Sequence, residues 1–104
     1  MKPQPLILAT FMALAAMPVF AADSAALFKD KTCWSCHGKD AKTPILPEYP
    51  KIAGQNAKYA EAQMHDIKSG ARANGNTAAM KAVMTLVNDE EIKALADYLS
   101  KLKP

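Results

Sequence analysis

Two cysteines and a histidine form the cluster of this 104-residue chain that could do chemistry. Cys33 and Cys36 are three positions apart, and His37 follows the second cysteine directly. Two thiols about one helical turn apart can each bond to a vinyl group of haem, while the adjacent imidazole can bind the haem iron. The motif therefore predicts one haem c, covalently attached through Cys33 and Cys36, with His37 as the proximal axial ligand.

Other uses of a Cys-x-x-Cys pair fit the sequence less well. A thioredoxin-like dithiol would need a strand pattern around the motif, and we find no convincing one. A structural zinc site would need a fourth ligand, for which His65 is the one further candidate of a usual type. A plain disulfide is compatible with an exported protein but leaves the placement of His37 unexplained. We therefore favour haem attachment.

The first 21 residues have the composition of an export signal. Lys2 precedes an apolar stretch from Leu6 to Met17, and small residues stand at the expected cleavage position near Ala21. The stretch is shorter than the ~20 residues that span a bilayer, and Pro18 interrupts it. We therefore predict cleavage after Ala21, a single domain over residues 22–104, a periplasmic location and no stable membrane insertion.

The predicted mature domain is small, and its net charge is close to zero. Removal of residues 1–21 leaves 83 of the 104 residues, enough for one small domain. It carries 12 basic and 10 acidic side chains, and two haem propionates would bring its net charge close to zero. We expect no nucleic-acid partner, and we expect the haem to supply much of the core.

Helical periodicity dominates the mature sequence. The first helix is predicted to begin near Asp23 or Ser24, either of which could cap it, and to lead into the cysteine motif. The last helix is predicted to follow Asn88, which forms a variant of the capping box with Glu91. The apolar residues of the last helix recur at three- and four-residue steps, so one face must be buried. We expect the two terminal helices to pack through Leu27, Phe28, Leu95 and Tyr98.

The middle of the chain is predicted to contain two loops and one helix. Residues 38–55 carry three prolines and Gly54, which indicates an ordered loop. Asn56 can cap a helix to about Ser69. Residues 71–79 are predicted as a second loop, leading to Met80 and a short segment that could be helical. The buried side of the middle helix is expected to carry Tyr59, Ala60, Met64 and Ile67.

These segments resemble the small class I bacterial cytochromes c over residues 23–102. The matching parts are residues 27–28, 33–38, 49–55 and 89–99. The resemblance implies an all-α class I cytochrome c fold, with three to four helices wrapped around one covalently bound haem and the terminal helices packed together. It also implies a one-electron carrier rather than an enzyme, working as a monomer between transient redox partners.

The resemblance further implies that a methionine before the last helix is the distal iron ligand. This position favours Met80, with Met84 as the alternative, whereas Met64 is expected to pack in the core. Methionine ligation raises the reduction potential. His65 would instead be a second nitrogen ligand, but its neighbour Met64 is expected to face inward, and adjacent helical residues point about 100° apart.

Smaller expectations concern residues around the motif. The family pattern suggests that the Pro47 carbonyl accepts a hydrogen bond from His37. Trp34 is expected to cover the haem edge, and Tyr49 and Tyr59 either reach the propionates or pack in the core. Arg72, the sole arginine, stays unassigned. Lysines that could steer an acidic partner are Lys31, Lys39, Lys42, Lys51 and Lys81.

Two rival functions stay open at this point. One is a ligand-binding or peroxidatic haem protein in which Met80 does not bind iron and the sixth site is open. The other is a haem subunit of a larger oxidoreductase. A methionine-to-iron charge-transfer band in the oxidised protein tests the first alternative, and size exclusion of the native extract tests the second.

Overall fold

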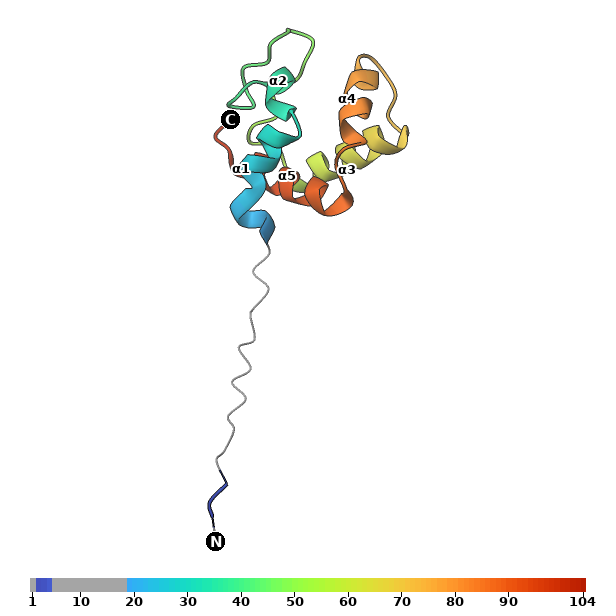
Figure 1. The fold of residues 1–104 in the computed structure, drawn as a ribbon. Helices are drawn as coiled ribbons and strands as arrows, with labels where there is room; N and C mark the ends of the chain where they lie inside the picture. Colours follow the sequence, from blue (N-terminus) through green and yellow to red (C-terminus); the bar gives the residue numbers. More distant parts are fainter. Residues whose placement is uncertain (1, 5–18) are drawn as a thin grey trace.

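The computed structural model describes residues 2–4 and 19–104, and over these residues it contains five helices and no strand. The helices pack together into one small domain, as Figure 1 shows. Most of the predicted leader lies outside the described residues, so its removal stays a prediction. The helices are α1 (Val19–Asp30), α2 (Cys33–His37), α3 (Ala57–Ser69), α4 (Thr77–Met84) and α5 (Asp89–Lys101).

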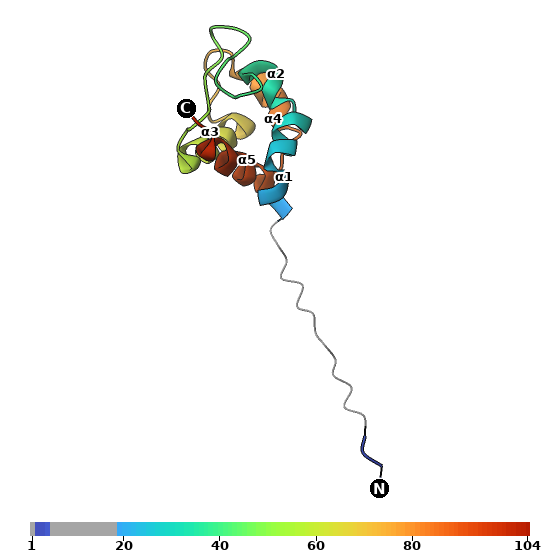
Figure 2. The same cartoon turned by 90° about the vertical axis from the view of Figure 1, so that its left-hand side faces the viewer.

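The all-α prediction is confirmed, and the terminal helices pack together as expected. The rings of Phe28 on α1 and Tyr98 on α5 have centroids 5.7 Å apart, and Figure 2 shows the two helices side by side. The predicted start of α1 at Asp23 or Ser24 is wrong, because the helix already begins at Val19. The alanines at positions 21 and 22 are strong helix formers and extend it toward the N-terminus.

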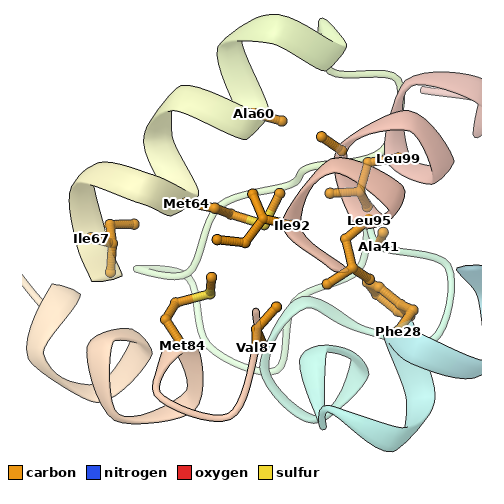
Figure 3. Packing of buried hydrophobic residues seen from close by; sticks show 11 residues of the cluster. Phe28, Ala41, Ala60, Met64, Ile67, Met84, Val87, Ile92, Leu95 and Leu99 are labelled. Carbon is orange, nitrogen blue, oxygen red and sulfur yellow. The ribbon is translucent and has the colours of Figure 1, made fainter. Parts of the chain in front are cut away.

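The core lies where α3 and α5 meet, and it also takes side chains from α1 and α4. Figure 3 shows Met64 and Ile67 of α3 facing Ile92 of α5, with Met84 of α4 beneath them. Tyr59 is 53% exposed, so its predicted place on the buried side of α3 is wrong. The other three predicted positions of that face are buried. No helix described in residues 19–104 is long and apolar enough to cross a bilayer.

Side-chain caps set the starts of the two long helices. The Asn88 side chain accepts a hydrogen bond of 2.8 Å from the Glu91 amide, and the Glu91 carboxylate accepts one of 3.0 Å from the Asn88 amide. This reciprocal pair is the predicted capping box. Asn56 caps α3 by accepting from the Tyr59 amide at 3.0 Å, and Gly70 ends that helix in the left-handed conformation.

The segment between α2 and α3 is an ordered loop, as its prolines predicted. The Ala41 carbonyl accepts hydrogen bonds from the amides of Ile52 (2.8 Å) and Ala53 (3.0 Å), which closes the loop on itself. Gly38 opens the loop with a φ of 88°, and a Cβ there would lie 2.2 Å from the Thr43 carbonyl oxygen. A side chain at position 38 would therefore collide with the returning backbone.

Helix α4 begins earlier than predicted. The predicted loop 71–79 overlaps the helix, which starts at Thr77, and the short segment from Met80 onward is helical. The turn before it is held by a hydrogen bond of 2.7 Å from the Thr77 hydroxyl to the Asn74 carbonyl. Alanines at positions 78 and 79 then favour helix from its first turn.

Candidate functional site

A cavity of about 530 Å³ opens between α2 and α4, and the rest of its wall comes from α1, α3, α5 and the two loops that flank α3. In Figure 1, α2 and α4 lie on opposite sides above α3 and α5. The volume falls within the range of about 300–1,000 Å³ that is typical of ligand and cofactor pockets. Most of the lining is apolar, with contributions from Phe28, Ile52, Ile67, Val83, Leu95 and Leu99.

The cysteine motif forms a short helix of its own on one wall. Thr32 adopts a left-handed backbone conformation (φ 64°), which separates α2 from α1. Cys33 and Cys36 both carry free thiols and both line the cavity. Burial raises the pKa of the Cys33 thiol to about 11, and nearby Cys36 adds a smaller effect in the same direction. The Cys33 sulfur is therefore neutral, and both cysteines face one space, as a double thioether attachment requires.

His37 is the most buried member of the motif, at 8% exposure, and it too lines the cavity. Its Nδ1 donates a hydrogen bond of 2.9 Å to the Pro50 carbonyl oxygen. Because a carbonyl only accepts, the proton belongs on Nδ1, and Nε2 keeps the lone pair that a metal needs. Burial lowers the pKa of His37, and the bond to Pro50 offsets part of this effect. The neutral, metal-binding form is favoured.

The acceptor for His37 differs from the one predicted. Pro50 takes the role expected of Pro47, and Pro47 does not line the cavity. The hydrogen bonds from Ile52 and Ala53 to the Ala41 carbonyl bring the end of the loop back to the motif. This closure presents residue 50 to the imidazole, and it depends on backbone contacts that local sequence does not reveal.

Three methionines reach the cavity, and they are buried to different degrees. Met80 projects from α4 and is only partly buried, packed against the edge of the core. Met84 is 3% exposed and belongs to the core itself, as Figure 3 shows, together with Met64. The predicted packing role of Met64 therefore agrees with its position. The cavity contains both candidate distal ligands, and the looser packing of Met80 leaves its thioether available for a metal.

Of the other residues considered near the site, some line the cavity and Trp34 does not. Trp34 is 38% exposed and lies off the cavity wall, because its indole nitrogen donates to the Lys29 carbonyl at 3.1 Å. Its expected place over the haem edge therefore finds no support in the lining of the cavity. Tyr49 and Tyr59 do line the cavity. So does Arg72, whose guanidinium donates to the Gln63 side chain at 3.0 Å. Sequence reasoning left it unassigned, since a lone arginine in a loop gives no signal of a cavity position.

Neither a zinc site nor iron binding by His65 is supported by the described part of the chain. His65 lies outside the cavity wall, with its Nδ1 3.7 Å from the Asp89 carboxylate on the surface. Among the described residues, no group of three or more His, Cys, Asp or Glu side chains is placed to hold a metal ion. By contrast, two thiols, one oriented imidazole and a thioether around an apolar cavity fit a covalently bound haem.

The helical fold, the apolar cavity and the Cys-x-x-Cys-His motif on the cavity wall together define a class I c-type cytochrome. Residues 21–103 match the profile of the Cytochrome c family, and the chain belongs to that family. Membership implies a covalently bound haem c.

Relatives of known name agree with this assignment. The chain is 38% identical to cytochrome c-554(548) of Halomonas halodenitrificans over 76% of its own length and 96% of the relative. It is 37% identical to cytochrome c4 of Pseudomonas aeruginosa over 72% of its length, but this match spans only 35% of that relative. The solved structure of reduced cytochrome c4 from Pseudomonas stutzeri superposes with a TM-score of 0.71 at 31% identity, covering 83% of this chain and 50% of the other.

Proposed function

We propose that this chain is an exported one-electron carrier with a single haem c, bonded to Cys33 and Cys36 and held between His37 and Met80. One observation carries the proposal: the cavity has the attachment motif on one wall and an available thioether on another. When bound, the haem supplies an iron centre that takes up and releases one electron. If His37 and Met80 both bind the iron, they would leave no position on the metal for a substrate.

The remaining residues of the site support electron transfer by holding their geometry. The hydrogen bond to Pro50 orients the His37 ring, and the backbone bonds to Ala41 hold the loop that carries Pro50. Apolar side chains from α3 and α5 exclude water from the inner cavity. A site built in this way needs little rearrangement when the charge on the metal changes.

We further propose that residues 1–21 direct export and are removed, leaving the domain 22–104 in the periplasm. An oxidising compartment suits a protein whose two thiols are consumed by haem attachment. Helix α1 runs through the proposed cleavage point, and the mature helix would start close to Ala22. Partners would be bound briefly, through interfaces below about 1,200 Å² in total.

The test is purification from a host that matures c-type cytochromes. The intact mass should equal residues 22–104 plus one haem, and a redox titration should show a one-electron transition. The variant in which Cys33 and Cys36 are both replaced by alanine should lose the covalent haem. A colourless wild-type protein with the mass of bare polypeptide would exclude the proposal, and size exclusion would show whether it is a monomer or a subunit.

A further inference from the structure

The linker between α4 and α5, residues 85–88, is held by two lysine side chains from distant parts of the chain. Lys31, just beyond the end of α1, donates a hydrogen bond of 2.9 Å to the Leu86 carbonyl oxygen. Lys68, near the end of α3, donates to the next carbonyl, that of Val87. Two successive carbonyls of a four-residue linker are thus each bound by a charged donor, which is the stronger kind of hydrogen bond.

Lys31 also connects the linker to the start of α5. Its ammonium lies 3.4 Å from the Glu91 carboxylate, and both side chains are partly buried. The other oxygen of that carboxylate accepts the Asn88 amide in the capping box. Lys31 itself stands two residues before Cys33, so it links the attachment side of the cavity to the segment that follows α4.

The linker controls the position of α4. Helix α4 packs against α3, and the two carbonyls bound by lysine lie two and three residues beyond its last residue, Met84. Met84, which directly precedes the linker, and Val87, which lies within it, are both embedded in the core. Met80 lies one turn before Met84 on the same helix. Because Met80 and Met84 lie on one helix, a movement of α4 and of the bound linker would carry Met80 away from the cavity.

We propose that Lys31 and Lys68 are positioning residues that clamp the α4–α5 linker and thereby limit how fast the distal ligand Met80 leaves the iron. The inference rests on the proposed function, because it takes Met80 as the distal ligand. Neither lysine lines the cavity, so neither touches the haem site directly. Their effect is on the opening of the segment that carries the ligand.

The test uses the oxidised, haem-loaded protein with imidazole as a competing ligand. At saturating imidazole, the observed binding rate reports the opening of the Met80 segment. Lys68→Met and Lys31→Met should each raise this limiting rate about tenfold or more, as expected for loss of one hydrogen bond to a charged donor. Lys58→Met on α3 and Lys29→Met on α1 are matched controls, because each removes one exposed lysine charge from the same helix or its end, and both should keep the wild-type rate.

Two further variants keep the test decisive. Lys68→Gln retains a donor without the charge, and it replaces Lys68→Met if that variant does not fold. Glu91→Gln keeps the capping acceptor but removes the ion pair with Lys31, so it should raise the rate less than Lys31→Met does. The unfolding midpoint of each variant in denaturant is measured alongside the rate.

The outcomes separate the clamp from the proposed function. If the wild type shows the methionine charge-transfer band but both lysine variants bind imidazole at the wild-type rate, the clamp is rejected and Met80 ligation stands. Rates that rise only in proportion to global unfolding also reject it. If the wild type lacks the band and binds imidazole without a limiting rate, the proposed ligation itself fails and the clamp fails with it.

Discussion

Replacement of Met80 and of Met84 by alanine should have opposite consequences, because the two side chains differ in burial. Met84 is 3% exposed within the core, and truncation of a buried methionine to alanine costs about 2–5 kcal/mol. Small domains have only about 5–15 kcal/mol of stability in total. Met84→Ala should therefore lower the unfolding midpoint strongly, yet keep the methionine-to-iron charge-transfer band.

Met80→Ala should show the reverse pattern. Its side chain is only partly buried, so the packing loss is smaller than at position 84. The charge-transfer band should disappear, and the reduction potential should fall because a thioether favours the reduced iron. Absorbance of the oxidised protein, a redox titration and denaturant unfolding measure these three effects on each variant.

The control for this pair is Met84→Leu. Leucine conserves the volume of methionine and costs less than about 1.5 kcal/mol, so this variant should fold even if Met84→Ala does not. It should retain the band. Loss of the band in Met84→Leu together with its retention in Met80→Ala would refute the assignment and make Met84 the distal ligand. Retention in both variants would exclude both methionines.

Substitutions at three further positions test the structure that holds the site. Asn88→Ala removes the side-chain cap of α5 and should lower the unfolding free energy by about 1 kcal/mol, whereas Asn88→Asp, which keeps an acceptor, should stay close to wild type in the same denaturant titration. Gly38→Ala places a Cβ 2.2 Å from the Thr43 carbonyl oxygen, at a φ of 88° that side chains rarely adopt. The yield of haem-loaded protein should therefore drop sharply. A normal yield would show that the loop can shift. Trp34→Phe removes the hydrogen bond to the Lys29 carbonyl but leaves the cavity wall intact. The free energy of unfolding should therefore fall by about 1 kcal/mol, with no change in reduction potential. A changed potential would place the indole against the haem.

Local sequence was sufficient for the parts of this protein that depend on neighbouring residues. The spacing of Cys33, Cys36 and His37 predicts the attachment site, because double thioether attachment needs its residues within one helical turn, and the structure places all three on one cavity wall. Asn56 and Asn88 marked the starts of α3 and α5, because a helix cap is a contact over three residues. Periodicity identified the buried face of α5, since the helical repeat is set by the backbone alone.

Contacts between distant segments were decided only by the tertiary structure. The loop closure at Ala41 brings Pro50 rather than Pro47 to the His37 ring, a contact across 13 positions in the chain. The indole of Trp34 turned away from the cavity to satisfy its N–H at the end of α1. The lysine contacts to Leu86 and Val87 span 55 and 19 positions. Such pairings follow from how helices pack around a shared core, and no spacing rule along the chain encodes them.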